Sequence, residues 1–371
     1  MNTQVPANFY PDKIIVEKTV MSLAYTRKIL SNLPGVPVEL VDETKDTKKY
    51  FHQNNDKRVF LLTNYKGNVI KKCPGSRGVL CCNYFVANLI NGCPYSCTYC
   101  ILKDYLNCGS IMVCVNIDKF FHELSRYIKP GYVFRLGTGE LADSLAFDPL
   151  LHLTDELLPR LKQYPSVLLE LKTKSAYIDR VLRYDMQDQV IVAWSLNPQE
   201  IIDLYEEGSV SLDNRIGAAQ TAVKHGYRVA FHFDPVILVD GWSDKYSEVI
   251  KKIFQNIPAE KIVWISMGGL RFTASLKRMS LAQHKETDIF SHGEFVMCRD
   301  NKLRYFRPLR RELYRKMLAM IRRFSQTVPV YMCMETTQVW QEVFNTVPAR
   351  EKGLSLVYDK YPDKNIDEGP I

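Results

Sequence analysis

The chain contains 371 residues, enough for two or three domains or for one α/β barrel with a small additional domain. Its 46% hydrophobic and 24% charged residues exclude a disordered chain, a collagen and a small disulfide-stapled scaffold. The formal net charge of +8 permits a phosphate-bearing partner without requiring one. The sequence has neither an apolar run near the ~18 residues of a membrane-spanning helix nor a secretory signal pattern, so we expect a cytoplasmic protein.

Residues 1–45 predict a small strand–helix–strand domain. A strand is expected within 9–18, a helix at 20–33 and a second strand at 37–41. The polar run 42–57 indicates a linker, and we assign residues 46–82 to a linker and a cysteine-containing approach segment.

Residues 83–350 predict a larger domain in which strands alternate with helices. The strand-like apolar runs are 83–90, 132–137, 166–172, 190–196, 228–236, 261–267 and 328–333. Most are separated by amphipathic stretches, as in parallel βαβ units. We therefore predict an α/β fold, a partial (β/α) barrel of about six parallel strands, with its active site at the carboxyl ends of the strands.

Residues 293–308 interrupt this pattern, because two strand-like runs flank a polar turn and predict a hairpin. A basic helix is expected at 309–324, and residues 351–371 are expected to form a loose tail.

Cysteines are concentrated in one part of the chain, with eight of the ten between Cys73 and Cys114. Clustered thiols in a reducing compartment indicate metal binding or catalysis. Cys93, Cys97 and Cys100 form a C-x3-C-x2-C motif. Three thiolates on a four-iron cluster leave one iron free for a substrate or cofactor. The alternatives are a structural zinc site completed by Cys108 or Cys82, and a group of core cysteines.

This motif, after a strand and before a helix, resembles the signature of the radical S-adenosylmethionine (radical SAM) superfamily. The resemblance implies a [4Fe–4S] cluster on the three cysteines, and S-adenosyl-L-methionine as the cofactor that is cleaved to a 5′-deoxyadenosyl radical. Tyr99 stands where the superfamily places a residue against the adenine.

Polar residues and glycines at later strand ends look like the rest of this cofactor site. The resemblance implies that Glu140 contacts the cofactor's ammonium group and Lys174 its carboxylate. The complete set of expected cofactor contacts is Gly137, Gly139, Glu140, Lys174, Ser195 and Asn197. The alternatives are a simple turn at Gly137–Glu140, an exposed Lys174, and helix capping by Ser195 and Asn197.

Most of the chain resembles the spore photoproduct lyase family within that superfamily. The similar segments include 212–227, Asp234-Pro235, Gly241-Trp242 and 270–279. The resemblance implies radical repair or modification of a DNA base lesion, first of all a thymine photoproduct, with electrons from a flavodoxin or ferredoxin. Two features differ from the family pattern: residues 137–144 contain no cysteine, and Ile101 stands where the lyase has a tyrosine.

Basic and aromatic side chains alternate from the hairpin into the next helix, which suits phosphate contacts and base stacking. The residues expected to contact nucleic acid are Arg271, Lys302, Arg304 and Arg307. The alternative is a solvated basic helix face. His232, in the middle of a strand, is expected to be a hydrogen-bonded core histidine.

If a thiol returns hydrogen to the product, Cys333 is the candidate, because it ends the last strand-like run. Cys298 lies on the hairpin and is the second choice, and the alternative for Cys333 is a core thiol. Two other functions stay open. One is a radical SAM enzyme with a peptide or small-molecule substrate, and the other is a non-catalytic, metal-stapled nucleic-acid-binding protein.

Overall fold

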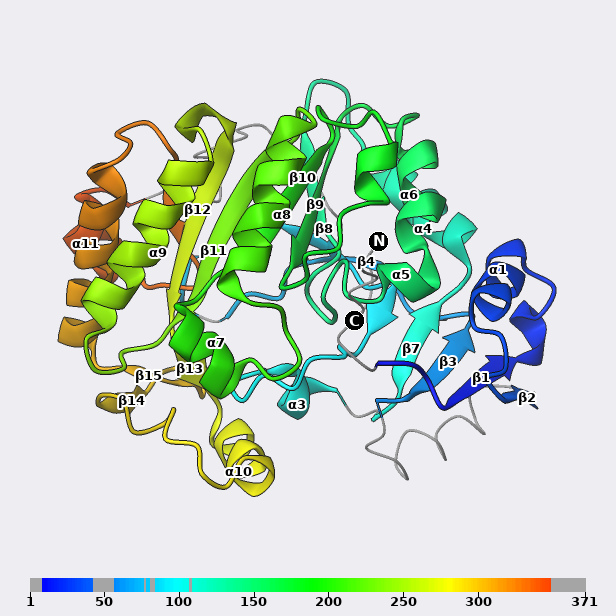
Figure 1. Ribbon diagram of the computed structural model, residues 1–371, viewed down its shortest axis with the longest axis horizontal. Helices are drawn as coiled ribbons and strands as arrows, with labels where there is room; N and C mark the ends of the chain where they lie inside the picture. Colours follow the sequence, from blue (N-terminus) through cyan, green and yellow to red (C-terminus); the bar gives the residue numbers. More distant parts are fainter. Residues whose placement is uncertain (1–8, 43–56, 77, 81–83, 107–108, 348–371) are drawn as a thin grey trace.

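The computed structural model describes residues 9–42, 57–76, 78–80, 84–106 and 109–347 (Figure 1). Its centre is an eight-stranded sheet in which seven neighbouring strands are parallel and only β4, at one edge, is antiparallel. In sheet order the strands are β16 (Val330–Met332), β12 (Ile262–Gly269), β11 (Arg228–Val236), β10 (Val190–Ser195), β9 (Val167–Thr173), β8 (Phe134–Gly137), β5 (Phe85–Ala87) and β4 (Ile70–Lys72).

This sheet curls into a half-barrel. Arg135 of β8 donates to the hydroxyl oxygen of Tyr331 on β16 across 3.1 Å, although four strands separate β8 from β16 in the sheet. The Arg135 guanidinium also lies 4.0 Å from the ring centroid of Trp264 on β12. Such contacts require both sides of the sheet to curve toward one interior. The predicted partial barrel is confirmed, with seven parallel strands instead of about six.

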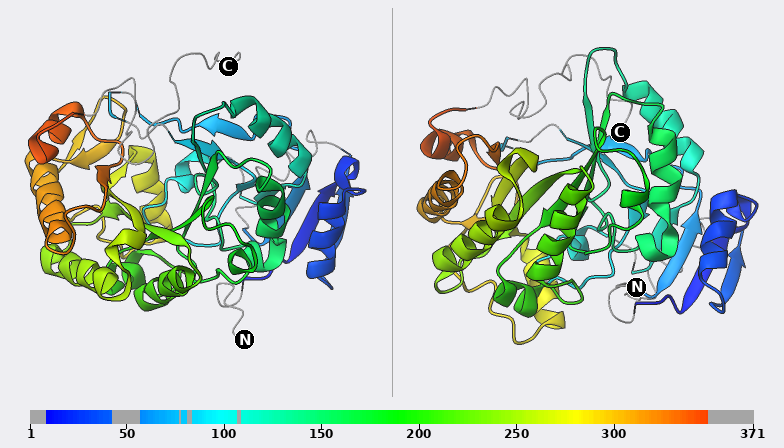
Figure 2. Two further views of the ribbon diagram at one scale, coloured as in Figure 1. Left: turned by 90° about the horizontal axis from the view of Figure 1, so that it is seen from above. Right: turned by 45° about the horizontal axis from the view of Figure 1, so that its top comes forward.

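Helices form the outer layer around this sheet, as Figure 2 shows. Their buried faces are apolar; α9, for example, buries Val249, Ile250 and Ile253. The helices after the strands are α4 (Ile117–Tyr127), α5 (Asp148–Leu151), α6 (Leu153–Leu161), α7 (Gln199–Tyr205), α8 (Leu212–Lys224), α9 (Trp242–Asn256), α11 (Arg307–Arg322) and α12 (Thr337–Phe344). Ser211 caps α8 by accepting from the backbone N–H of Asn214.

The N-terminal segment folds as expected into β1 (Lys13–Glu17), α1 (Ala24–Asn32) and β2 (Val38–Val41). Its strands, however, belong to a larger five-stranded sheet in the order β2-β1-β3-β7-β6. The other members are β3 (Val59–Thr63), β7 (Ile111–Cys114) and β6 (Ile90–Asn91). This sheet therefore crosses the boundaries expected near residues 45 and 82. Most of the expected linker, 43–56, and the expected tail, 351–371, lie outside the described residues.

The expected hairpin is present as β14 (Phe295–Met297) and β15 (Leu303–Tyr305), which pair antiparallel. The short strand β13 (Arg271–Phe272) joins them in a third sheet. Among the described residues, the helices α3 (Leu102–Tyr105) and α10 (Ala274–Gln283) lie near the carboxyl ends of the half-barrel strands (Figure 1). Within the described part of the chain, no helix has the length and hydropathy needed to cross a membrane.

Candidate functional site

The three clustered cysteines lie on the loop between β6 and α3. Gly92 begins this loop with a positive φ of 111°, and a Cβ there would lie 2.7 Å from the Ile111 side chain, so only glycine fits. The loop is fixed by two backbone hydrogen bonds, in which Ser96 donates to Glu207 and Thr98 donates to Tyr205. The motif therefore packs against the end of α7 and the residues that follow it.

The thiols of this loop influence one another electrostatically. Burial, Asp143 and then the other two thiols raise the pKa of Cys93. Burial raises the pKa of Cys97 to about 12, against the opposing charge of Lys174. Thiols this close that bind as thiolates need a positive charge nearby to offset their repulsion, and a metal cluster supplies one.

Across the described residues, no three His, Cys, Asp or Glu side chains could share one metal ion. A four-iron cluster makes a different demand, because each cysteine binds a separate iron. Three half-buried or buried thiols on one short loop fit that demand.

A fully buried ion pair lies behind the loop. The Glu206 carboxylate is 2.7 Å from the Arg215 guanidinium, and both side chains are inaccessible to solvent. Glu206 also accepts hydrogen bonds from the Tyr99 hydroxyl and from the Asn197 amide. Burial alone would raise the pKa of Glu206, but Arg215 and Lys174 hold it at about 2. The Tyr99 hydroxyl is thus fixed inside the protein, with its pKa raised well above 10 by burial and by Glu206.

Lys174 brings a positive charge to the same place. Its ammonium group lies 5.7 Å from the centroid of the Tyr99 ring and donates to the Ser195 hydroxyl at 3.1 Å. Burial lowers its pKa, but Glu206 and Cys97 outweigh burial and keep the pKa above its usual value. The structure therefore brings Lys174, Ser195, Asn197 and Tyr99 together beside the cysteines.

Asp143 sets the position of Lys174, and sequence reasoning missed it. Its carboxylate accepts from the backbone N–H of Lys174 at 2.6 Å and from the Thr173 hydroxyl at 2.6 Å. It also accepts from the backbone N–H groups of Leu145 and Ala146. The sequence contains one clue, because Asp143 lies only three residues after Glu140, in a segment that was examined for its glycines, its glutamate and its missing cysteine.

The Gly137–Glu140 segment follows β8, as expected. A Cβ at Gly137 would lie 1.7 Å from the Tyr84 hydroxyl, and one at Gly139 would lie 3.0 Å from Cβ of Lys172. Close packing against the side chains of Tyr84 and Lys172 is therefore enough to explain why glycine stands at both positions. Glu140 accepts from the Asn88 amide at 2.9 Å.

Charged side chains also line the interior of the half-barrel. Glu170 of β9 lies 2.8 Å from Arg135 and 2.6 Å from His232 Nε2, and the Ser266 hydroxyl is 2.6 Å from His232 Nδ1. Burial raises the pKa of Glu170, but Arg135 and His232 lower it to about 2. His232 is therefore a hydrogen-bonded buried histidine, as expected. Arg135 and Glu170 were missed, although each is a charge within an apolar strand.

Arg271 and Cys333 lie near the last strands of the sheet. Two nitrogens of Arg271 lie 2.8 and 3.0 Å from the two carboxylate oxygens of Asp234, so its charge is already paired. A Cβ at Gly268 would lie 2.5 Å from Asp234 Oδ1. Any larger residue there would therefore clash with the Asp234–Arg271 ion pair. Cys333 follows β16, its backbone N–H donates to Met267, and its thiol interacts electrostatically with Arg271.

The hairpin residues that were expected to bind nucleic acid differ from one another in how exposed they are. Arg304 is 3% exposed and pairs bidentately with Asp300 at 2.5 and 2.7 Å. Lys302 is buried and donates to the Ser76 hydroxyl at 3.0 Å. Arg307, at the start of α11, is exposed beside Phe306. Only Arg307 of these three presents its charge to solvent.

The other cysteines within the described residues lie on other segments than this loop. Cys114 is buried at the end of β7, Cys73 is half-buried, and Cys298 is half-buried in the hairpin turn. Cys81, Cys82 and Cys108 lie outside the described residues.

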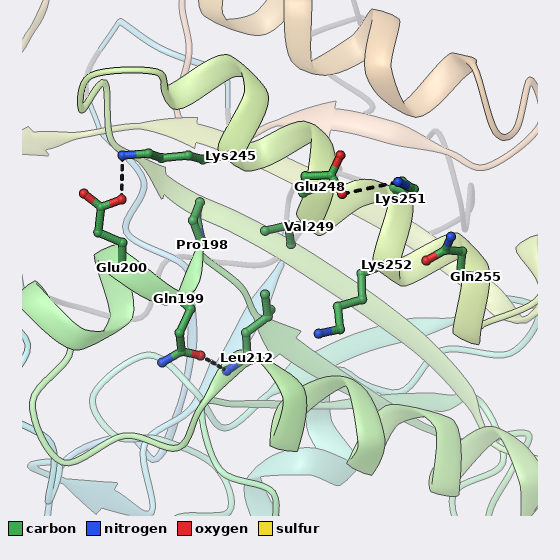
Figure 3. Close-up of a pocket in the computed structure, with 10 residues that line it drawn as sticks. All are labelled: Pro198, Gln199, Glu200, Leu212, Lys245, Glu248, Val249, Lys251, Lys252 and Gln255. Carbon is green, nitrogen blue, oxygen red and sulfur yellow. Dashed lines mark hydrogen bonds and ion pairs between the residues drawn. The ribbon is translucent and has the colours of Figure 1, made fainter.

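A surface pocket lies elsewhere, between α7 and α9 (Figure 3). Lys245 pairs with Glu200 at its rim, Lys251 pairs with Glu248, and Lys252 pairs with Asp213. No cluster cysteine lines it, and its ammonium groups are already paired with carboxylates. The pocket therefore does not belong to the site.

The sequence of the chain is similar to those of curated proteins called spore photoproduct lyase. Spore photoproduct lyase from Geobacillus sp. is 25% identical over 206 residues, which cover 54% of this chain and 60% of that protein. The Bacillus subtilis enzyme is 24% identical over 204 residues, covering 53% and 59%. The chain thus spans about 60% of the length of these curated relatives.

Solved structures show the same fold. A spore photoproduct lyase complexed with dinucleoside spore photoproduct superposes with a TM-score of 0.75 at 20% identity, covering 87% of this chain and 98% of that chain. A mutant lyase with bound AdoMet and dinucleoside spore photoproduct gives a TM-score of 0.74, covering 89% and 99%. A sequence model described as spore photoproduct lyase matches residues 9–294, more than half of the chain. The chain therefore belongs to the spore photoproduct lyase family.

Proposed function

We propose that this protein is a radical SAM enzyme that repairs or modifies a damaged base in DNA, with the thymine spore photoproduct as the first substrate to test. One observation carries the proposal: the loop with Cys93, Cys97 and Cys100 is held next to Lys174, at the carboxyl end of β9, in a half-barrel with a polar interior. The dinucleoside lesion bound in solved relatives supports a base lesion as the substrate.

Cys93, Cys97 and Cys100 would hold a [4Fe–4S] cluster, with its fourth iron left for S-adenosyl-L-methionine. When both are bound, they supply one-electron cleavage of the sulfonium to methionine and a 5′-deoxyadenosyl radical. This chemistry requires a reducing compartment, so we propose a cytoplasmic location and an electron donor such as a flavodoxin or ferredoxin.

The chain's own residues bind and orient the cofactor. Lys174 supplies an ammonium group for its carboxylate, and Ser195 holds that ammonium in place. Glu140 offers a carboxylate to the cofactor's amino group, and Gly137 and Gly139 shape the turn beside it. Asn197 and Glu206 fix the Tyr99 hydroxyl, so the tyrosine ring, and not its hydroxyl, is the part left to meet an adenine.

DNA would approach at the hairpin. Arg307 is exposed there, and Val296, Met297 and Phe306 are 37%, 58% and 45% exposed. Exposed apolar side chains beside a cation suit stacking on an unpaired base. Lys302, Arg304 and Arg271 would act indirectly, because their pairs with Ser76, Asp300 and Asp234 set the shape of this region.

Anaerobic reconstitution with iron and sulfide tests the proposal. The protein should turn brown, contain four irons and four sulfides per chain, and release 5′-deoxyadenosine with S-adenosyl-L-methionine and dithionite. A dinucleoside photoproduct should be converted, and an undamaged dinucleoside should not. Cys97→Ala should lose the colour and the cleavage, and the matched control Cys298→Ala should keep both.

Three outcomes would contradict the proposal or part of it. A colourless protein that holds zinc and leaves S-adenosyl-L-methionine intact would indicate the metal-stapled binding protein. Cofactor cleavage without DNA binding at low salt would indicate another substrate class. Loss of the cluster in Cys108→Ala would show a fourth thiol ligand and no open iron.

A further inference from the structure

Two layers of titratable side chains lie inside the half-barrel. Glu170 and His232 form the deeper layer, where they are 1% and 6% exposed. Two residues later on the same strands stand Lys172 of β9 and Asp234 of β11, which are half-buried. Because alternate residues of a strand share a face, Lys172 and Asp234 face the same interior, one step nearer the carboxyl ends of the strands. The interior therefore becomes accessible to solvent at this second layer.

Four charges of the two layers form ion pairs, and a fifth does not. Arg135 pairs with Glu170 at 2.8 Å, and Arg271 pairs with Asp234 at 2.8 Å. Among the residues that the structure describes, Lys172 forms no ion pair, and its ammonium group donates no hydrogen bond. These three cations and two carboxylates thus leave one positive charge without a counter-charge.

The charge of Lys172 acts on both layers. Burial and then Lys172 lower the pKa of His232. Burial raises the pKa of Asp234, but Arg271 and, after it, Lys172 lower that pKa to about 2. Both carboxylate oxygens of Asp234 are already bonded to Arg271. The Lys172 ammonium group therefore points into the half-barrel, near a carboxylate that another cation holds.

The segment after β8 fixes the base of the Lys172 side chain. A Cβ at Gly139 would lie 3.0 Å from Cβ of Lys172, and the Ser144 backbone N–H donates to the Lys172 carbonyl at 3.0 Å. Lys174, which would hold the cofactor's carboxylate, follows two residues later. At about 3.3 Å per residue the two lysines stand about 7 Å apart along the chain. A ligand on Lys172 would therefore lie close to the cofactor.

We propose that Lys172 binds the phosphate that links the two nucleosides of the damaged DNA, and so favours a lesion that carries this phosphate. The inference rests on the proposed function and deepens it, because that function supplies a DNA lesion as the ligand. An ammonium group in a half-buried interior of low dielectric is stabilised by an anion. The phosphodiester is the anionic group of a dinucleotide, whereas its bases are neutral.

Arg271 connects this layer to the hairpin, where DNA would approach. It lies on β13, which pairs with β15 of the hairpin, and its guanidinium holds Asp234 (Figure 1). A base taken out of the duplex at the hairpin would enter the interior with its phosphate attached. Because Arg271 is already paired, Lys172 is the better placed of these two cations to receive that phosphate.

Three variants and three ligands test the proposal. Lys172→Met removes the charge and nearly keeps the length of the side chain, and Lys172→Arg keeps the charge. The matched control, Lys224→Met, removes an exposed charge at the end of α8. Each reconstituted protein is titrated calorimetrically with the spore photoproduct dinucleotide, which carries the linking phosphate, and with the dinucleoside, which lacks it. Inorganic phosphate is the third ligand and needs no lesion.

The wild type should bind the dinucleotide more tightly than the dinucleoside. Lys172→Met should bind the dinucleotide about tenfold more weakly and the dinucleoside with unchanged affinity. Lys172→Arg should keep most of the preference for the dinucleotide, and Lys224→Met all of it. Unchanged dinucleotide affinity in Lys172→Met overturns the proposal. Equal losses for both photoproducts also overturn it, because Lys172 would then contact a base or support the fold.

The proposed function can fail separately in the same titrations. If the wild type binds neither photoproduct, the lesion is not the substrate, and inorganic phosphate decides the role of Lys172. Weaker phosphate binding by Lys172→Met than by the wild type would support an anion site at Lys172 for another phosphorylated substrate. Phosphate binding that is equal in the two proteins, or undetectable in both, overturns the site.

Discussion

The carboxylate of Glu206, at the end of α7, lies 2.7 Å from the guanidinium of Arg215 on α8, and neither side chain reaches solvent. Arg215 also donates to the Ser195 carbonyl at 2.9 Å, at the end of β10. Glu206 accepts from Tyr99 on the cysteine loop. One buried ion pair thereby joins the cysteine loop, a barrel strand and two helices.

Arg215→Ala should destabilise the protein strongly, because it leaves the Glu206 carboxylate buried without its main counter-charge. We expect a loss of about 3–5 kcal/mol in the free energy of unfolding, measured by urea denaturation. Lys252→Ala breaks an exposed ion pair with Asp213 and should cost at most about 1 kcal/mol. Equal losses in the two variants would show that the Glu206–Arg215 pair does not anchor the fold.

Acid should destabilise the protein in a defined range. Glu206, Glu170 and Asp234 each have a pKa near 2, where their usual values are 4.5, 4.5 and 3.8. Burial opposes ionisation at each position, and the partners Arg215, Arg135 and Arg271 overcome it. A lowered pKa in the folded state means that the unfolded chain takes up protons first as the pH falls.

The stabilisation by these carboxylates is therefore complete above about pH 4.5 and is lost as the pH falls toward 2. We would measure the free energy of unfolding by urea titration at pH 7, 5, 4 and 3. It should be constant from pH 7 to pH 5 and should decline below pH 5. Glu206→Gln should show a shallower decline than the wild type. An unfolding free energy independent of pH between 5 and 3 would contradict this account.

The sequence predicted the barrel strands well because parallel strands buried on both sides are continuous apolar runs. It did not predict β7, because residues 111–114 lie among cysteines and were interpreted through their thiols. The motifs also predicted that the cysteines and Lys174 belong to one site, and the structure places Lys174 close enough to Cys97 for their charges to interact, while their binding roles stay predictions. Asp143 and Arg135 act through contacts between distant segments, which no local pattern contains. Lys302 and Arg304 have the sequence pattern of surface charges. In the structure both side chains are buried, because Lys302 donates to Ser76 and Arg304 pairs with Asp300.

Lys174→Ala should weaken S-adenosyl-L-methionine binding by about 10- to 100-fold, the usual effect of losing a hydrogen bond to a charged group. Glu140→Ala should weaken it as well, and both variants should keep the brown cluster. Equilibrium binding of the cofactor to the reconstituted variants measures this. Lys245→Ala, at the pocket on the outer surface, is the control. Wild-type cofactor affinity in Glu140→Ala would remove Glu140 from the site.

Arg307→Glu should reduce DNA affinity and flatten its dependence on salt, because the Arg307 charge is exposed next to the hairpin. Arg304→Ala should act differently: it leaves Asp300 without its partner and disturbs the turn, so it should lower the melting temperature more than Arg307→Glu does. Fluorescence anisotropy with a short duplex at several salt concentrations gives the affinities. A salt slope unchanged in Arg307→Glu would place DNA elsewhere.

The last prediction concerns the thiol that returns hydrogen to the product. Cys333 follows β16 two residues after Tyr331, and alternate strand residues share a face. Tyr331 accepts from Arg135 inside the half-barrel, and Cys333 lies in the bend directly after β16, where its backbone N–H donates to the Met267 carbonyl of β12. Its proximity to Arg271 agrees with that position. Cys298 lies in the hairpin turn, where its thiol faces the Val296 carbonyl at 3.8 Å.

Cys333→Ala should therefore still cleave S-adenosyl-L-methionine but should release incomplete or trapped products in place of the repaired base. Cys298→Ala should release the normal product at the wild-type rate. Chromatography and mass spectrometry of the products formed from the dinucleoside photoproduct distinguish these outcomes. Normal product from both variants would mean that neither Cys333 nor Cys298 is the donor, and that hydrogen returns from 5′-deoxyadenosine itself or that no thiol is needed.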